Sequence, residues 1–428
     1  MPAALLRPLL LAALLLGVIA APASPQGEDG RGGIWISRAE VQRLPVGGPA
    51  WSALSQRADQ PLGKADIADQ DTEHDVTTFA AALVYARTNS SRLRQKAATG
   101  IMDAIGTEKG GRTLALARAL MPYVLAADLI DLRDFDRGKD RVFRRWLRKV
   151  RTERLAPRAR PTLIDTHEFA ANNWGTHAGA SRIAADVYLG DRKDLARAAA
   201  VFKGYTGDRS AYAGFNFGDD HTWQADPAHP VPIVHKGGRR GGMFLDGALP
   251  DDMRRGCSRR RDPCPTRYPW EAMQGIVAQA QLLNRQGYNA WNWNDQAVRR
   301  AAEFLYRVNR HWPHEDWNAP QGNEWIPWLL NARYGTHFET KLPAKPGKAM
   351  GFTDWTDAQP CAQESCTAPV SDPVRVRPVA PRPQPVPRAQ DKADDGPPVG
   401  AIAGVAAALA ALAAGALVLA RRRSRQAH

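Results

Sequence analysis

The stretch DVTTFAAALVYARTNSSRLRQKAATGIMDAIGT, residues 75–107, decides the fold class of this chain. Apolar residues recur there at i, i+3 and i+4 on both sides of a short polar break, which predicts two helices, 75–88 and 91–107. Helices joined by so short a turn form an antiparallel hairpin, and the hairpin needs further helices to cover its apolar face. The stretch therefore favours an all-α fold built from helical hairpins.

The helical spacing continues through most of the chain from about residue 34 to residue 355. It predicts further helices over residues 111–132, 141–155, 169–191, 192–207, 268–287, 294–311 and 324–334. No convincing alternating strands interrupt this series, and the apolar stretch before Asp165 is too short to begin a sheet. We therefore expect one domain over residues 30–357, an incomplete or complete α/α toroid of hairpins, although patterning supports hairpins better than ring closure.

One long segment, residues 205–265, breaks the helical rhythm. It is rich in glycine, proline, histidine and aromatic residues and shows no helical period. Loops of this length are usually functional or disordered, and the aromatic content argues against disorder. We expect substrate contacts in this segment.

The four cysteines form two close pairs, Cys257 with Cys264 and Cys361 with Cys366. An even number at short spacing in an exported protein favours local disulfides. A metal site is the rival interpretation, but neither pair is CxxC and no histidine pattern accompanies them. We expect disulfides, no metal and no cofactor.

The two ends of the chain are predicted to be targeting and anchoring segments, outside the folded domain. Residues 1–25 contain an early arginine, an unbroken apolar run and then small residues, the layout of a signal peptide. A Pro-rich linker, 358–398, precedes an uncharged apolar run, 399–420, and the basic tail 421–428. These segments predict an exported, cell-surface body on a single-pass membrane helix with a cytoplasmic tail. A buried Ala-rich helix is the alternative, which the Pro-rich and Arg-rich flanks disfavour.

The formal net charge is +14, and the four arginines of the tail supply only part of it. The remaining excess suits a polyanionic partner, although charged surfaces also serve solubility. Nucleic acid is not expected, because the exported domain carries no recognisable binding motif. An acidic polysaccharide fits both the predicted location and the sign of the charge.

The stretch FAANNWGTHAGASRIAADVYLGD, residues 169–191, holds the first candidate site residues. Asn173 and His177 are four residues apart, so on a helix they share one face. The alternative interpretation is a helix cap at Asn172 or Asn173 and a hydrogen-bonded core histidine.

A second group follows in DGALPDDMRRG, residues 246–256, and at Tyr268. Arg254 or Arg255 could bind a carboxylate in a bidentate manner, and a cation near a tyrosine favours the ionised hydroxyl that proton transfer requires. Two solvated arginines and a core tyrosine are the alternative.

Asparagine, histidine, arginine and tyrosine together suit one reaction of acidic sugars. Abstraction of the C5 proton of a uronate is difficult until donors such as Asn and Arg neutralise its carboxylate. A His or Tyr can then take the proton and a Tyr can protonate the departing O4. This β-elimination needs no metal.

The two motifs resemble those of the alginate lyase family, helical α/α-toroid polysaccharide lyases with Asn-Asn-His at a helix entry. IWISRAEVQRLPVGGPAW (residues 34–51) and AADLIDL (126–132) also fit that family. The resemblance implies that Asn173 neutralises the carboxylate, that Arg255 assists it, and that Tyr268 is acid and perhaps base.

Two departures from the family pattern matter. Trp174 stands at the family's histidine position, and an insertion containing Cys257 and Cys264 separates Arg255 from Tyr268. We therefore expect His177 to supply the imidazole and Trp174 to stack on a sugar ring. Further predicted substrate-binding residues are Asn172, Trp223, Gln224, Arg254, Trp270 and Gln274, and the spare candidates for the base are His221 and His235.

Two other functions stay open at this stage. A glycoside hydrolase would need two carboxylates facing across a cleft, which could come from Asp219, Asp220, Asp251, Asp252 and Glu271. A non-catalytic cell-surface protein that binds acidic glycans is the second alternative, raised by Trp174 in place of the family's histidine.

Overall fold

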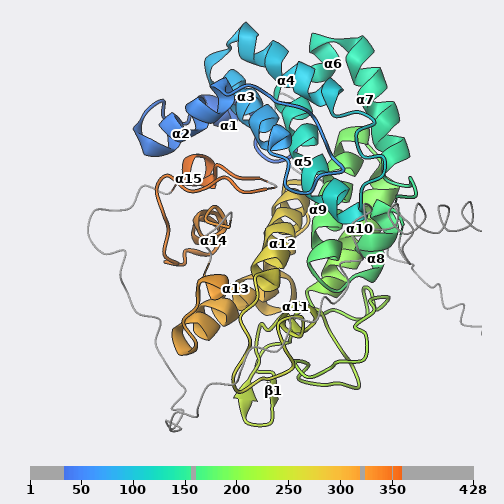
Figure 1. Ribbon diagram of the computed structural model, residues 1–428, viewed down its shortest axis with the longest axis vertical. Helices are drawn as coiled ribbons and strands as arrows, with labels where there is room; N and C mark the ends of the chain where they lie inside the picture. The colour runs from blue at the N-terminus through green and yellow to red at the C-terminus, as the bar shows by residue number, and fades with distance from the viewer. Residues whose placement is uncertain (1–32, 156–160, 319–322, 349, 359–428) are drawn as a thin grey trace, which may run out of the picture. The chain divides into compact units, whose positions relative to one another are not determined.

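The computed structural model describes residues 33–155, 161–318, 323–348 and 350–358 (Figure 1). This part of the chain is mostly helical, and its one sheet is a two-stranded antiparallel hairpin of β1 (Arg239–Arg240) and β2 (Met243–Phe244). The all-α prediction is confirmed for the described residues. None of their helices is both long enough and apolar enough to cross a membrane. The predicted signal peptide, linker, membrane helix and basic tail lie outside the described residues, as do Cys361 and Cys366.

The predicted helices are present, with shifts of a few residues at several ends. The long helices are α2 (Gly48–Asp59), α3 (His74–Thr88), α4 (Ser91–Asp103), α5 (Thr113–Leu129), α7 (Arg137–Val150), α9 (Asn173–Leu189), α10 (Arg192–Tyr205), α12 (Tyr268–Arg285), α13 (Trp293–His311) and α14 (Ile326–Tyr334). The short ones are α1 (Arg38–Gln42), α6 (Leu132–Phe135), α8 (Leu163–Phe169), α11 (Pro250–Met253), α15 (Thr353–Thr356), η1 (Ala290–Asn292) and η2 (Glu315–Trp317).

Short helices and glycine-rich starts account for the elements that the periodicity missed. The apolar stretch before Asp165 forms α8, which is too short to show a helical period and starts at the cap residue Thr162. The helix α2 begins with Gly48 and a proline, a pair that resembles a turn in sequence. The predicted helix over 169–191 is in fact the end of α8 followed by α9.

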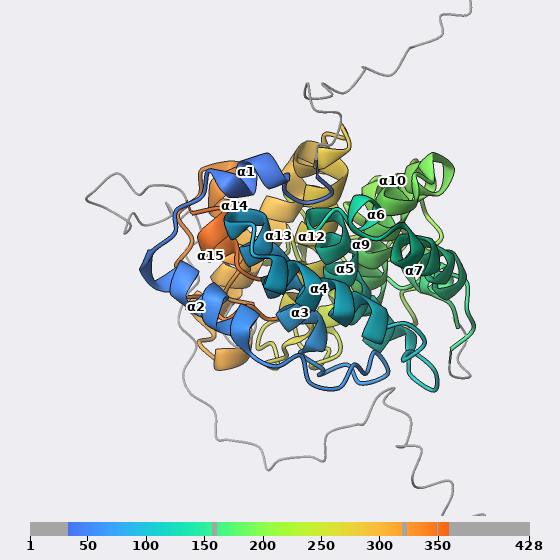
Figure 2. The same ribbon diagram turned by 90° about the horizontal axis from the view of Figure 1, so that it is seen from above.

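Four helices form the centre of the fold. Helices α3, α5, α9 and α12 are buried along most of their length, and α9 packs extensively on both α5 and α12 (Figures 1 and 2). Helix α4 follows α3 after a two-residue break, in which Asn89 adopts a left-handed backbone and Ser90 caps α4. The predicted hairpin of residues 75–107 is therefore confirmed.

Residues from the first two turns of three central helices meet at one end. Arg118 in the second turn of α5 and His177 in the second turn of α9 both face Glu271 in the first turn of α12. These helices are thus parallel, and the side chains at their starts share one region. The irregular segment that precedes α12 gathers near the same end of that helix (Figure 1).

A serine of α9 forms hydrogen bonds with the backbone of α5 next to the internal proline of that helix, Pro122. The Ser181 hydroxyl donates to the Ala117 carbonyl at 2.7 Å and accepts from the Met121 N–H at 3.1 Å. It therefore occupies the place of the helical bond between residues 121 and 117, next to the proline that disturbs the helix. Because Ser181 is fully buried, this bridge fixes α9 against α5.

Close approach of α9 and α12 depends on Gly275. A Cβ added there would lie 2.3 Å from the carbonyl carbon of Thr176, which is a backbone atom of α9. No side chain larger than hydrogen fits between the two helices at this point. Gly275 thus sets the spacing of the two helices that carry Asn173 and Tyr268.

Helices near the two ends of the described body also contact one another. The rings of Trp51 in α2 and Trp355 in α15 have centroids 5.3 Å apart, and Trp355 Nε1 donates to the Pro45 carbonyl at 2.9 Å. Arg285 at the end of α12 forms a bidentate pair with Glu40 of α1, at 2.9 Å for both bonds. The described body is therefore held together by contacts between residues far apart in sequence.

Candidate functional site

The candidate site lies where α9 and α12 begin, beside the turn that contains α11. Asn172 is the N-cap of α9, since its Oδ1 accepts from the Trp174 backbone N–H at 3.1 Å. Its Nδ2 donates to Asp251 at 2.7 Å. Both ends of this amide are used within the protein, so the structure corrects the prediction of Asn172 as a substrate-binding residue. The cap interpretation of this motif therefore holds at Asn172, and the site interpretation at Asn173 stays a prediction.

The α11 turn anchors the start of α9 with two buried carboxylates. Asp252 Oδ1 accepts the backbone N–H of Asn173 at 3.1 Å, and Asp251 accepts from Arg254 Nε at 2.7 Å. Burial raises the pKa of Asp252 well above its usual range, against the positive charge of Arg255. Both aspartates therefore hold the turn, and Arg254 is directed to Asp251.

Arg255 brings Asn173 and Tyr268 together. Its Nη1 donates to Asn173 Oδ1 at 2.7 Å, and its guanidinium carbon lies 3.4 Å from the centroid of the Tyr268 ring. Within the described residues, neither Asn173 Nδ2 nor the Tyr268 hydroxyl makes a hydrogen bond. One cation, one amide donor and one phenol thus share a small region, in which Asn173 is 4% exposed and the Arg255 side chain 16% exposed.

His177 is buried and faces Glu271. It is 1% exposed, and its Nε2 is 3.7 Å from Glu271 Oε2, too far for a full hydrogen bond. Burial lowers the pKa of His177, although the nearby Glu271 carboxylate opposes the shift. The structure therefore corrects the expectation that this imidazole is presented directly to a ligand.

Glu271 links the three helix starts. Its side chain is 22% exposed, and Oε2 lies 3.5 Å from Arg118 Nη2 and 3.3 Å from Gln274 Nε2. Burial alone would raise the pKa of Glu271, but His177 and Arg118 outweigh that effect and lower it. Gln274 itself is buried, so its role is inside the protein and not at a substrate surface.

Arg118 is a site residue that the sequence reasoning missed. It is the only charged side chain in the first fourteen residues of α5, within TLALARALMPYVLAADL. A lone charge in an apolar helix is unusual, because burying it without a partner is costly. That pattern was the available signal, and the partners are the carboxylates of Glu271 at 3.5 Å and Asp71 at 3.8 Å.

Trp174 is half-exposed at the start of α9. The guanidinium carbon of Arg112 lies 5.8 Å from the centroid of its ring, within the range of a cation–π contact. Stacking of this ring on a sugar stays a prediction.

Three predicted substrate contacts are in the interior instead. Trp223, Gln224 and Trp270 are each 1% exposed. Trp223 Nε1 donates to the Cys257 carbonyl at 3.3 Å, and Gln224 pairs with the backbone of Val231 in both directions. Because all three side chains are buried, the structure corrects their assignment as sugar-binding residues. Trp223 and Gln224 hold the irregular segment in place, whereas Trp270 Nε1 in α12 donates to the Trp317 carbonyl at 2.6 Å.

The spare histidines are outside this group. His221 contacts two backbone carbonyls, of Gly218 at 2.9 Å and Pro227 at 3.1 Å, whereas His235 is exposed. No hydrogen bond or ion pair connects either of them to Arg255 in the described structure.

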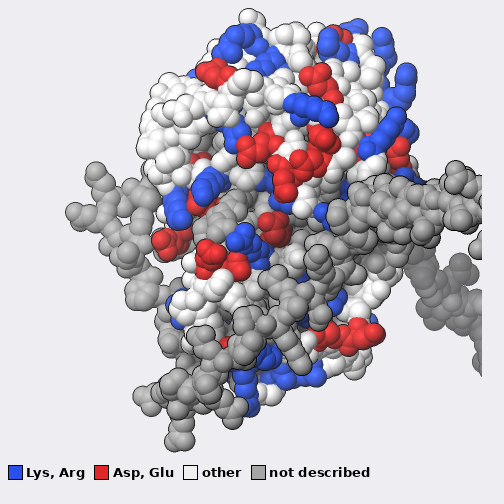
Figure 3. All heavy atoms as spheres, viewed as in Figure 1, with Lys and Arg blue, Asp and Glu red and all other residues white. Residues whose placement is uncertain are grey.

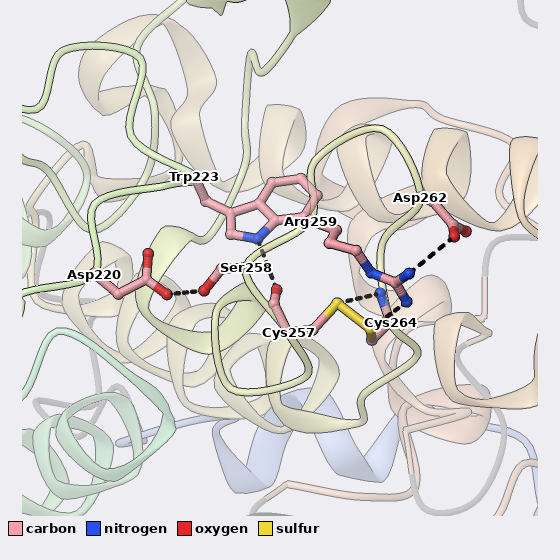
Figure 4. Close-up of a disulfide and its surroundings, with 7 residues drawn as sticks. All are labelled: Asp220, Trp223, Cys257, Ser258, Arg259, Asp262 and Cys264. Carbon is pink, nitrogen blue, oxygen red and sulfur yellow. Dashed lines mark hydrogen bonds and ion pairs between the residues drawn. A yellow bond between two sulfur atoms is a disulfide. The ribbon is translucent and has the colours of Figure 1, made fainter. Parts of the chain in front are cut away.

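The predicted disulfide between Cys257 and Cys264 is confirmed (Figure 4). It closes a loop of the insertion between Arg255 and Tyr268. Beside it, Ser258 donates to Asp220, which fastens the loop to the segment before Trp223. The insertion is therefore a fixed part of the irregular segment.

The described carboxylates include one close group of three, Asp186, Asp191 and Asp194. Arginines already pair with them: Arg151 contacts all three, and Arg182 Nη2 lies 2.5 Å from Asp194. The arrangement is an ion-pair network between α7, α9 and α10.

Acidic and basic side chains are interspersed on the face in Figure 3, so the excess positive charge does not form a single continuous surface there.

The chain was compared with known proteins in three ways. No family model, no curated protein and no solved structure matches it.

Proposed function

We propose that this chain is a polysaccharide lyase that cleaves a uronate-containing polysaccharide, such as alginate, by β-elimination. The carrying observation is the double contact of Arg255, which bonds Asn173 and stacks on Tyr268. The sequence resemblance to the alginate lyase family, which assigns roles to the same three residues, supports the proposal independently of these distances.

Neutralisation of the carboxylate is the first requirement of the reaction. In the proposal, Asn173 Nδ2 and the remaining N–H groups of Arg255 donate to the uronate carboxylate. Charge-assisted bonds of this kind stabilise the extra negative charge that develops when C5 loses its proton. The buried Asp252 fixes Asn173 through its backbone, so the donor is placed before substrate arrives.

Proton transfer is the second requirement, and the proposal assigns it to Tyr268. In the proposal, the phenolate oxygen of Tyr268 takes the C5 proton and becomes a neutral hydroxyl. The electron pair left on C5 forms the C4–C5 double bond as the bond from C4 to O4 breaks. O4 then takes the proton back from Tyr268, which restores the ionised hydroxyl. His177 and Glu271 hold the two helix starts in register.

The finer fold assignment, an α/α toroid, belongs to the same proposal. Packing of α3, α5, α9 and α12 in chain order supports it, as does the contact between Trp51 and Trp355 near the two ends of the body. We further propose that the body acts outside the cell membrane, anchored through residues 399–420.

The test is the ultraviolet absorbance of unsaturated product ends, measured on a panel of uronate polysaccharides. Tyr268→Phe should reduce kcat by about 10²- to 10⁴-fold with little change in KM, because it removes proton transfer and keeps the ring. Tyr288→Phe is the matched control, a half-buried tyrosine beyond the other end of α12, and should behave as the parent.

Other outcomes identify the alternatives. New reducing ends without double bonds would indicate a hydrolase, which would need a second carboxylate besides Glu271. Binding without any cleavage would indicate a glycan-binding protein, and Trp174→Ala should then weaken binding. Equal turnover by Tyr268→Phe and the parent would overturn the proposed site.

A further inference from the structure

A cavity of about 330 Å³ lies in the irregular segment, next to the disulfide and apart from Asn173 and Tyr268. Residues of the β1–β2 hairpin and the disulfide loop line it, among them Gly241, Ser258, Arg259, Arg260, Arg261 and Asp262. Three successive arginines face a single aspartate, so the lining has an excess of positive charge.

Contacts with the backbone hold the cavity in shape. Arg260 Nη1 donates to the Arg240 carbonyl in the hairpin at 2.7 Å. Gly241 and Gly242 form the two-residue hairpin turn with positive φ at both positions, which favours glycine. A Cβ at Gly241 would lie 3.2 Å from Arg260 Nη1, so this glycine also leaves room for the guanidinium.

The arginines are only partly neutralised. Arg259 lies 3.5 Å from Asp262, with both side chains largely exposed, whereas Arg261 makes no hydrogen bond or ion pair within the described residues. Burial lowers the pKa of Arg260, and repulsion from Arg240 and Arg261 adds to the shift. Like charges kept this close are stabilised by an anion between them.

We propose that this cavity binds an anionic group, a carboxylate or a sulfate ester, of an acidic polysaccharide held away from the cleavage site. The identity of the polymer rests on the proposed function, whereas the anion site rests on the cavity and its arginines. The disulfide loop that forms the cavity lies between Arg255 and Tyr268 in sequence, so a chain bound at the catalytic group has an adjoining structure to contact.

The experiment measures polymer binding, by calorimetry, separately from cleavage. The probes are alginate, dextran sulfate and neutral dextran, and the variant is Arg259→Ala with Arg261→Ala, which keeps the Arg260 contact to the hairpin. The matched control is Arg141→Ala with Arg145→Ala, two exposed arginines of α7. Circular dichroism and thermal unfolding check that both variants fold.

We expect the cavity variant to bind the anionic polymer about tenfold more weakly, the control to change less than twofold, and neutral dextran not to bind. Weakening with alginate alone or with dextran sulfate alone would identify a carboxylate or a sulfate site. Equal binding by both variants would overturn the cavity site, even if the parent cleaves alginate. Tenfold weaker binding in a protein that cleaves no polymer would keep the site and refute the lyase.

Discussion

The α9–α12 interface and the irregular segment before α12 are stabilised in different ways. At the interface, helices approach so closely that only glycine fits at position 275, and most side chains are buried. The segment from residue 206 to residue 267 is held instead by a disulfide and by side chains that bond to backbone, such as Gln224 to Val231 and Arg260 to Arg240. Regular packing positions the proposed catalytic group, whereas individual contacts shape the proposed anion cavity.

This difference suggests two distinct responses to mutation. A change in the interface should lower global stability, because the helices fold as one packed unit. A change in the segment should loosen it locally and leave the helices intact.

The largest effect is expected from Gly275→Ala. The added methyl group would meet backbone atoms of Thr176, which cannot rotate away, so the free energy of unfolding should fall by about 3 kcal/mol. Urea unfolding measures it. Gly47→Ala is the control, since a Cβ there meets nothing within 4 Å. A change below 0.5 kcal/mol, as roughly typical of surface substitutions, would show that the helices separate easily.

Ser181→Ala should have the next largest effect, about 2 kcal/mol. It removes a hydroxyl that satisfies both the Ala117 carbonyl and the Met121 N–H, and leaves these buried groups unpaired. Ser52→Ala is the control, because that hydroxyl is exposed on α2. Equal stability of both variants would mean that α5 regains its own helical bond next to Pro122.

The sequence predicted the interface better than the segment, and the reason is physical. A helix repeats its environment every turn, so the periodicity revealed α3, α5, α9 and α12 directly. Short motifs and the family resemblance, not periodicity, predicted that Asn173, Arg255 and Tyr268 act together, and Arg255 contacts both of the others in the structure.

Periodicity could not predict how deeply a side chain is buried, or which residues far apart in sequence contact one another. Trp223 and Trp270 looked like sugar-binding residues because aromatic residues serve both core and surface, and only their depth distinguishes the two. The ion pair of Arg118 with Glu271 joins residues far apart in sequence, and His177 loses its exposed role for the same reason.

Removal of the disulfide tests whether the irregular segment unfolds separately from the helices. Cys257→Ser with Cys264→Ser should lower stability by about 2 kcal/mol, at the low end of the range for disulfides, because the bridge closes a short loop. Hydrogen exchange should rise in residues 239–262 and stay unchanged in α9 and α12. Equal loss of protection in α12 would show that the segment and the helices unfold as one unit.

The smallest effect concerns pH and the buried His167 of α8. Burial lowers its pKa well below the usual value, and the neighbouring Arg182 adds to the shift. The native state therefore keeps His167 neutral while the unfolded chain gains a proton below a pH of about 6.5, so stability falls as pH falls through that value. One such histidine contributes about 0.7 kcal/mol between pH of about 7 and about 6. His167→Gln should reduce the slope of urea midpoints against pH, and the exposed His311→Gln should keep the parent's slope. An unchanged slope in His167→Gln would mean that His167 binds its proton equally in the native and unfolded states, so that burial does not shift its pKa.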